Sequence, residues 1–402
     1  MRAGLRPASV AWLSETGRSR QQAREVQAQE VVPELYRDAL MKRRSVLQVP
    51  SGISMGSALP ITCENAARPE RFLITVVADG GWDPTRLTDP KGNTLRADGR
   101  GPVNHYAAAA IKAAGMLQYA GYPDSVEPPP VTSPGHLDTF FTKHHQRLLV
   151  INGIDTGARG HASGHRCVWS SRCEAGYPTI NALVAAQVPG QALVFPANAV
   201  CNDRAARVAA IQPRYARGNE LQLDAFSARL PLEVSSGFKG QGEVALAAFA
   251  SGLATSARLE LGGFDTHINH DVAQTTALTG LLEGIDHLWA QIEHHGMQHS
   301  VTVLIGSDFG RSPWYNAAGG KDHWHVASML AMGAGVAGNR TVGASTADVD
   351  ALRLNPATLA PHSSGIVLTP AHIHRAVRDL FQVSATLDQK YPLNAEPLGL
   401  FG

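Results

Sequence analysis

The stretch FLITVVA at residues 72–78, followed directly by DGGWD at residues 79–83, decides the fold. Seven consecutive apolar or β-branched residues are typical of a strand that is buried on both faces of a parallel sheet. Similar apolar runs occur in LLVINGI at residues 148–154 and in VTVLI at residues 301–305. Such strands, alternating with helical segments, predict an α/β fold in which a mostly parallel sheet is sandwiched by helices.

The clearest predicted helix precedes the strand at residues 301–305. Its apolar residues recur at helical spacing, and Gly296 is suited to end it. Residues 179–188 and 369–381 are also expected to be helical, the latter with a proline at its start. The periodic residues of the main helix are Leu278, Leu281, Leu282, Ile285, Leu288 and Ile292. Further strands are expected at residues 192–195 and 259–264 and from residue 329 onward.

The composition excludes several classes of protein. With 44% hydrophobic and 17% charged residues among 402, the chain is too apolar to be disordered. Lysine and arginine number 35 against 34 acidic residues, so the chain lacks the basic excess that is typical of nucleic-acid binders. No uninterrupted apolar run reaches the 18 residues or so of a membrane span. We therefore expect a folded protein with no nucleic-acid partner and no membrane span.

The first 70 residues differ from the rest of the chain. Residues 1–44 hold nine basic and five acidic residues, and their apolar residues show no sustained period. The sequence MKRRSVL at residues 41–47 resembles a twin-arginine export signal, with Arg43 and Arg44 as the arginine pair. It predicts a periplasmic or secreted protein with Met41 as the true start. The alternative is a solvated basic linker on a cytoplasmic protein.

We expect one α/β domain over residues 71–402, with loop-rich insertions at about 84–133 and 204–242. The four cysteines show no CxxC spacing, so a thiolate zinc site is not expected. Cys167 and Cys173 are close enough in sequence to form a disulfide in an oxidising compartment. The alternative is that all four cysteines are free thiols.

Polar residues, among them carboxylates and imidazoles suited to metal ligation, follow four separate predicted strands. In a parallel sheet, ligands lie just beyond the carboxyl ends of the strands, so these residues are expected at one edge. Converging carboxylates and imidazoles form a site for a divalent cation: zinc first, with manganese, iron or calcium as alternatives. The residues are Asp79 and Asp83; Asp155, Thr156, His161, Ser163 and His165; Asp265, His267 and His270; Ser307, Asp308 and Arg311; and Asp322, His323 and His325.

Four motifs make the sequence recognisable: GGWD at 80–83, GGFDTHINH at 262–270, SDFGR at 307–311 and GGKDHWH at 319–325. They resemble a bacterial family of exported proteins known as domain of unknown function 1501. That family is similar to the alkaline phosphatase and sulfatase superfamily, of which it looks like a distant branch. The resemblance extends from residue 72 to the C-terminus, with gaps in the middle. Residues 307–336 are also similar to the metal-binding stretch of phosphopentomutases.

The resemblance implies an alkaline-phosphatase-like fold and a set of metal ligands. His270 matches the spacing of the mutases, whereas His267 matches the DTH of the uncharacterised family. Arg311 would bind an anionic ester oxygen with two parallel hydrogen bonds. The implied metal ligands are Asp83 or its alternative Asp79, Asp265, His267 or His270, Asp308, Asp322 and His323.

Two departures from the superfamily affect the expected chemistry. Phe309 stands where the phosphatases have a metal-binding histidine. The nucleophile is also open, because ASGH at residues 162–165 only faintly resembles the TTGH of the mutases. Ser163 would be the attacking residue on that alignment, Thr156 is the competitor, and the third alternative is that neither attacks.

The motifs together predict an exported metal-dependent hydrolase that cleaves a small anionic ester, a phosphate or a sulfate. The alternative is a non-catalytic exported protein that keeps the fold and binds a metal. The sequence leaves the oligomeric state open.

Overall fold

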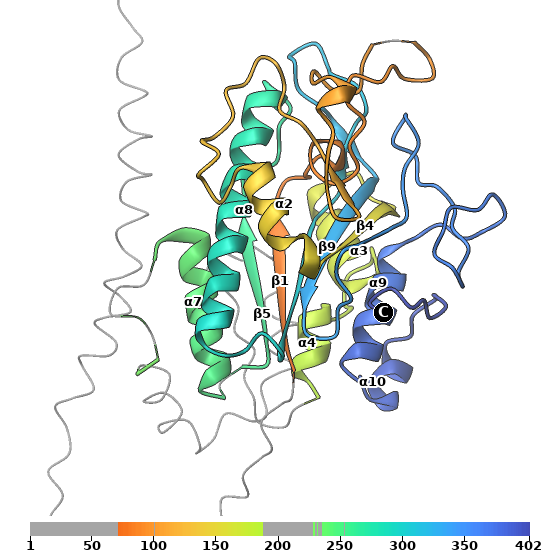
Figure 1. Ribbon diagram of the computed structural model, residues 1–402. Coiled ribbons are helices and arrows are strands. Elements are labelled where there is room, and N and C mark those ends of the chain that lie inside the picture. The colour runs from red at the N-terminus through yellow and green to blue at the C-terminus, as the bar shows by residue number, and fades with distance from the viewer. Residues whose placement is uncertain (1–70, 100, 188–227, 230, 232–234, 253) are drawn as a thin grey trace, which may run out of the picture. The chain divides into compact units, whose positions relative to one another are not determined.

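The computed structural model describes residues 71–99, 101–187, 228–229, 231, 235–252 and 254–402 (Figure 1). Three predictions fall outside these residues: the N-terminal export segment, the strand at 192–195 and most of the insertion at 204–242. Among the described residues, no helix combines the length and the hydropathy needed to cross a membrane.

The core of the domain is a six-stranded sheet in the order β10-β4-β9-β6-β1-β5. β1 runs parallel to β5 and β6, and β10 runs parallel to β4, whereas β9 is antiparallel to β4 and β6. The predicted α/β class with a mostly parallel sheet is therefore confirmed. The strands are β1 Phe72–Ala78, β4 Leu148–Asp155, β5 Ser256–Leu261, β6 Val301–Ser307, β9 Val326–Gly333 and β10 Arg340–Val342.

The direction of β9 has a physical cause in the segment before it. A parallel connection between neighbouring strands needs a crossover, usually a helix. Residues 308–325, which join β6 to β9, hold only the short strands β7 Gly310–Arg311 and β8 His323–Trp324. The chain therefore returns antiparallel beside β6.

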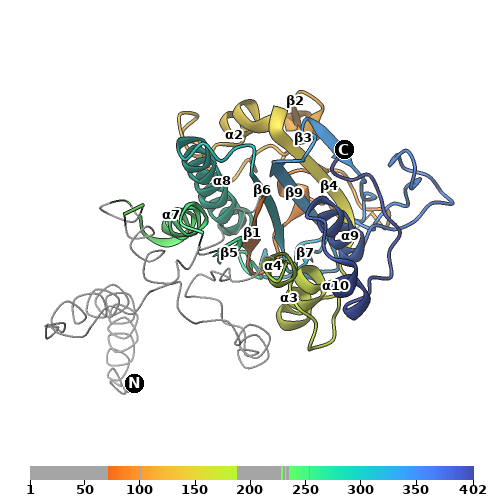
Figure 2. The same ribbon diagram turned by 90° about the horizontal axis from the view of Figure 1, so that it is seen from below.

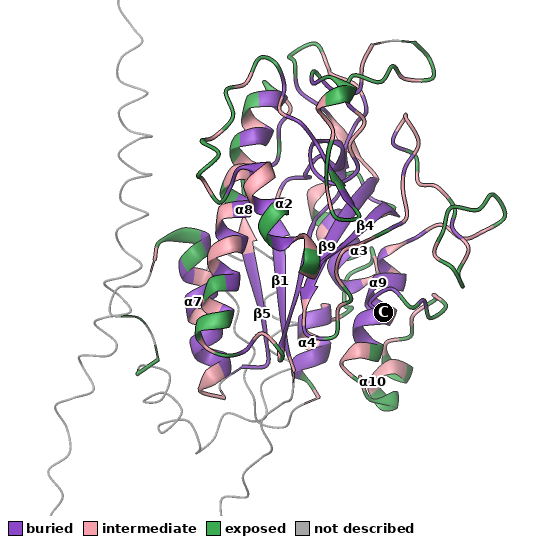
Figure 3. Ribbon diagram, viewed as in Figure 1, coloured by how far each residue is buried: buried purple, intermediate pink, exposed green. Residues whose placement is uncertain are grey.

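Helices cover both faces of the sheet (Figure 2). Side chains of β1 point alternately into two hydrophobic cores, one beneath each set of helices. The first core contains Phe72, Ile74 and Val76, and the second contains Leu73 and Val77. This alternation follows from the period of two residues in a strand, and it makes β1 buried along its whole length (Figure 3). The first set is α2 Leu137–His144, α7 Gly237–Ala250 and α8 His270–His294, and the second is α3 His161–Ser170, α4 Ile180–Ala185 and α9 Pro370–Leu380.

The predicted helices all form, with shifted ends. Every periodic apolar residue of α8 is buried, and the helix ends two residues before Gly296, whose φ of 67° suits glycine. A disulfide joins Cys167 in α3 to Cys173. The remaining elements are η1 Pro84–Arg86, η2 Ala108–Ala110, β2 Lys112–Ala114, β3 Leu117–Tyr119, η3 His145–Arg147 and α10 Ala385–Lys390.

Candidate metal centre

The register of the central strands places two carboxylates side by side. Ala78, the last residue of β1, pairs with Ser307, the last residue of β6. Asp79 and Asp308 are the next residues along the two parallel strands, so both leave the sheet at the same edge. This is the edge at which ligands bind in open α/β sheets.

We call the first group of potential ligands site A: Asp79, His161 and Asp308, whose ligand atoms lie within 4.8 Å of one another. His161 is the first residue of α3, and its Nδ1 lies 2.8 Å from Oδ2 of Asp308. The other carboxylate oxygen of Asp308 accepts hydrogen bonds from the Gly80 amide and the Ser307 hydroxyl. These two bonds fix the carboxylate so that Oδ2 faces site A.

His161 lies beside the aromatic ring of Phe309. The centroids of the two rings are 5.0 Å apart. An imidazole from α3 thus stands next to the phenylalanine side chain. The structure therefore places an imidazole at site A despite the phenylalanine at position 309.

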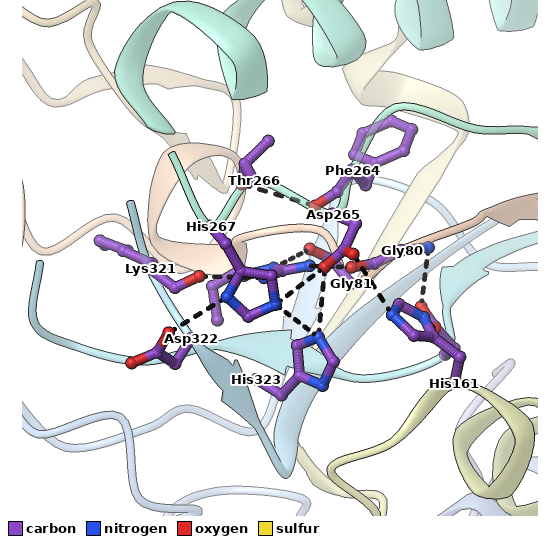
Figure 4. Close-up of polar contacts among 12 residues, drawn as sticks. Gly80, Gly81, His161, Phe264, Asp265, Thr266, His267, Lys321, Asp322 and His323 are labelled. Atoms are coloured by element: carbon purple, nitrogen blue, oxygen red, sulfur yellow. Dashed lines mark hydrogen bonds and ion pairs between the residues drawn. The ribbon is translucent and has the colours of Figure 1, made fainter. Parts of the chain in front are cut away.

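We call the second group site B: Asp265, His267 and His323. Nε2 of His267 lies 2.9 Å from Nε2 of His323 and 3.1 Å from Oδ1 of Asp265, and the His323–Asp265 distance is 3.2 Å. His161 lies between the two sites, because its Nε2 is 3.5 Å from Oδ2 of Asp265 (Figure 4). His161, Asp265 and His323 also form a group of ligand atoms within 4.8 Å.

Hydrogen bonds behind site B fix which nitrogen of each imidazole carries its proton. Nδ1 of His323 lies 2.8 Å from the carbonyl oxygen of Arg159, which can only accept, so Nδ1 donates. Nδ1 of His267 donates likewise to the carboxylate of Asp322, at 3.1 Å. In the neutral rings both Nε2 atoms then carry lone pairs, which face each other and Asp265. A cation bound between these three atoms, either a metal ion or an extra proton, would relieve the repulsion of their lone pairs.

The spacing of site B suits zinc. Two ligands at about 2.0–2.1 Å from a tetrahedral ion lie about 3.3 Å apart, close to the 2.9–3.2 Å between these three atoms. Two nitrogens and one oxygen are also a ligand set that zinc accepts. The donor chemistry of site B therefore fits a bound divalent cation.

Both sites contain a carboxylate that stays ionised at neutral pH. Partial burial by itself would raise the pKa of Asp265, but the hydrogen bond from Arg311 lowers it to about 2. The hydrogen bond from His165 lowers the pKa of Asp79. Carboxylates must be deprotonated to bind a metal, so these contacts prepare the ligands.

A hydrogen-bonded chain behind site A orients Asp79. The Arg258 guanidinium donates to Oε1 of Glu260, at 2.8 Å, and to Nδ1 of His165, at 3.0 Å. Arginine is always a donor, so Nδ1 of His165 accepts and its Nε2 carries the proton. That proton is donated to Oδ1 of Asp79, at 2.7 Å. The side chain of His165 therefore positions one of the site A carboxylates.

Asp83 and His270, two of the predicted ligands, bind each other in a buried network. Both side chains are fully buried, and they bind each other at 3.0 Å. Lys321, also fully buried, donates to the same oxygen of Asp83 at 2.7 Å, while Thr85 donates to the other. Asp83 is therefore the N-cap of η1 and the counter-ion of a buried lysine, away from sites A and B. Burial would raise its pKa, but Lys321 and His270 hold the pKa well below its ordinary value.

Arg311, which the sequence analysis expected to bind an anionic ester oxygen, has protein partners for its guanidinium. Its guanidinium is fully buried and donates to the carbonyl oxygens of Gly80, Gly81 and Lys321 and to Oδ1 of Asp265. These partners come from three separate segments. Arg311 therefore holds the loops of the site together.

The remaining predicted residues lie around the two sites. Asp322 binds the far nitrogen of His267, at 3.1 Å, and so orients this ring. The Ser163 hydroxyl donates to the Gly160 carbonyl in the first turn of α3. The Thr156 hydroxyl donates to the carbonyl of His325. Both candidate nucleophiles thus donate to main-chain oxygens.

Comparison with known proteins gives a family for part of the chain. Residues 244–363 match the model of the family DUF1501, which is described as a protein of unknown function. The predicted resemblance to this family is thereby confirmed over residues 244–363, which hold three of the four motifs. The matched stretch includes all of site B and Asp308, while Asp79 and His161 precede it. No curated protein matches the chain.

Solved structures of low identity also match. The lipoteichoic acid synthase LtaP from Listeria monocytogenes is 10% identical over 80% of this chain and 74% of its own, with a TM-score of 0.42. Murine ectonucleotide pyrophosphatase/phosphodiesterase 5 is 9% identical over 78% of this chain and 96% of its own, with a TM-score of 0.41. The phosphonate monoester hydrolase of Agrobacterium radiobacter is 9% identical over 78% and 74%, with a TM-score of 0.36.

The sequence placed His161 and His165 after a predicted strand, at the expected edge of the sheet, but the implied ligand set did not include them. The available signal was their spacing: residues four apart share one face of a helix, and α3 begins directly after the β4 loop. The structure brings Asp79, Asp265, His267, Asp308 and His323 together with His161 at sites A and B.

Proposed function

We propose that this chain is a metal-dependent hydrolase of phosphate or sulfate esters, with a small anionic ester as its substrate. The observation that carries the proposal is the meeting of two imidazole lone pairs and a carboxylate oxygen within 3.2 Å at site B. Site A adjoins it through His161. Paired sites of this kind are suited to transfer of phosphoryl or sulfuryl groups.

A bound divalent cation supplies positive charge that polarises the ester and stabilises the transferring group. The chain holds the ligands rigid for this task. The Gly80 amide and Ser307 hydroxyl fix Asp308, Arg311 fixes Asp265, and the backbone of Arg159 fixes His323. We assign the attacking oxygen to water, because both candidate hydroxyls donate to main-chain carbonyls, which cannot take up their protons.

The test combines metal analysis with turnover of 4-nitrophenyl phosphate and 4-nitrophenyl sulfate. We expect stoichiometric zinc, and a loss of at least about a hundredfold in kcat/KM for Asp308→Asn. Asp379→Asn on the surface of α9 is the matched control and should keep full activity. Absence of bound metal in the parent protein, together with unchanged melting after zinc addition, would overturn the proposal.

The second candidate is a non-catalytic metal-binding protein. Phe309 and the bonded hydroxyls of Ser163 and Thr156 favour it. Zinc retention that depends on Asp265 and Asp308, without turnover of any phosphate or sulfate ester, would establish this alternative over the hydrolase.

We propose further that the protein is exported to the periplasm or beyond. The Cys167–Cys173 disulfide supports this, because disulfides persist in oxidising compartments. Cell fractionation of a tagged full-length chain tests it. Recovery in the cytoplasm with both thiols free would contradict export.

A further inference from the structure

Arg159 is an exposed arginine at the rim of the candidate centre. Its guanidinium lies 4.3 Å from the ring centroid of Trp324 and donates a hydrogen bond to Nδ1 of His325, at 3.0 Å. These two residues directly follow His323 of site B. The guanidinium is therefore bound to the segment that carries one of the site B residues.

The backbone around Arg159 is tied to the same segment. The Arg159 carbonyl accepts the hydrogen bond from Nδ1 of His323, at 2.8 Å. The amide and the hydroxyl of Thr156 both donate to the His325 carbonyl, each at 2.8 Å. His161, two residues after Arg159, reaches both sites. The backbone of Arg159 is therefore held in place by its hydrogen bond with His323 and by the bonds of Thr156 to His325.

The charge of Arg159 has no carboxylate partner among the described residues. Arg96 provides a contrast, because it also stacks on a tryptophan, with 4.8 Å to the ring of Trp314. Arg96, however, forms ion pairs with Asp98 and Asp348. Stacking and the single hydrogen bond orient the guanidinium of Arg159 and leave its remaining N–H groups for an anion.

We propose that Arg159 binds a second anionic group of the substrate, next to the ester held at sites A and B. The inference rests on the proposed function and narrows it. The substrate class is an ester that carries a further oxyanion, a carboxylate, sulfate or phosphate, within a few bonds of the ester group.

The test is calorimetric binding of phosphonates, which need not be hydrolysed, to the zinc-loaded full-length protein. Two probes carry a second anionic group: 4-carboxyphenylphosphonate and 4-sulfophenylphosphonate. The third, 4-carbamoylphenylphosphonate, has a neutral amide in that position. We expect at least one charged probe to bind the parent protein about tenfold more tightly than the neutral probe, because hydrogen bonds to charged groups are the strong ones. The carboxylate and sulfonate arms distinguish the two chemistries.

The variants separate Arg159 from general charge effects. Arg159→Gln should abolish the preference for the charged probe, and Arg159→Lys should retain part of it. Arg96→Gln is the matched control and should keep the whole preference. Zinc content checks the fold, since the backbone carbonyl behind His323 remains in Arg159→Gln.

The outcomes distinguish this inference from the proposed function. If the tighter binding of the charged probes depends on Arg159 but the protein turns over no ester, the anion subsite is supported and the hydrolase proposal is overturned. Ester turnover without any such preference, an equal loss in Arg96→Gln, or no binding of any probe overturns the anion subsite.

Discussion

Arg311 shows how one buried side chain can determine the geometry of a site. Its planar guanidinium has several donors in a fixed arrangement, and they reach oxygens of Gly80, Gly81, Lys321 and Asp265 at once. Each of the three carbonyls would lose a hydrogen-bond donor if the guanidinium were removed. Arg311 therefore couples the loop after β1 to the loops that carry Asp265 and His323.

We predict that Arg311→Lys lowers the free energy of unfolding by about 3 kcal/mol, since an ammonium cannot reach all of these acceptors and leaves buried carbonyls unpaired. Urea denaturation measures the change. Arg353→Lys, at an exposed arginine that donates to one carbonyl, should change stability by no more than about 0.5 kcal/mol. Equal stability of Arg311→Lys and the parent protein would show that the network has no such role.

At the scale of elements, the position of His161 depends on how closely α3 packs. A Cβ atom at Gly164 would lie 2.5 Å from the Asp308 carbonyl oxygen, which is closer than real contacts allow. The glycine therefore lets the first turns of α3 approach the loop after β6. This approach is what brings His161 to the carboxylate of Asp308.

Gly164→Ala should push α3 away from this loop, lowering stability by about 1–3 kcal/mol through overpacking and weakening zinc binding. The control is Gly280→Ala on α8, where a Cβ atom finds nothing nearer than 4.0 Å. Alanine there should be neutral or stabilise the helix by up to about 1 kcal/mol. Denaturation and zinc titration of both variants check this, and unchanged zinc affinity in Gly164→Ala would contradict the role of α3.

Across the whole molecule, buried histidines make stability depend on pH. Burial lowers the pKa of His270 and of His374, each to about 4, from an ordinary value of 6.5. Between these values the unfolded chain takes up protons that the folded chain does not. The free energy of unfolding therefore falls as the pH drops from about 6.5 to about 4.

His374 on α9 isolates one part of this effect, because its buried side chain binds the Val168 carbonyl and belongs to neither site A nor site B. We predict that the stability difference between the parent protein and His374→Leu shrinks as the pH falls from about 6.5 to about 4. Denaturation in the presence of a chelator measures it without metal effects. His362→Leu, at an exposed position, is the control, and a difference independent of pH would refute the prediction.

Local patterns in the sequence determined the elements. The apolar runs of β1, β4 and β6 and the periodic face of α8 are features of neighbouring residues, so they could be predicted without tertiary information. The same patterns placed aspartates and histidines after the strands. With a parallel arrangement, that placement already put Asp79, Asp265 and Asp308 at one edge of the sheet.

The tertiary structure alone decided which of these side chains meet. Asp79 and Asp83 are four residues apart in one loop, yet one faces His161 while the other pairs with Lys321, more than two hundred residues away. Likewise Arg311 is buried among carbonyls and Arg159 is exposed. The direction of a loop side chain depends on partners that are distant in sequence, and no local period encodes them. Strands and helices form from local patterns in the chain, whereas a candidate metal site forms from residues that are distant in the sequence.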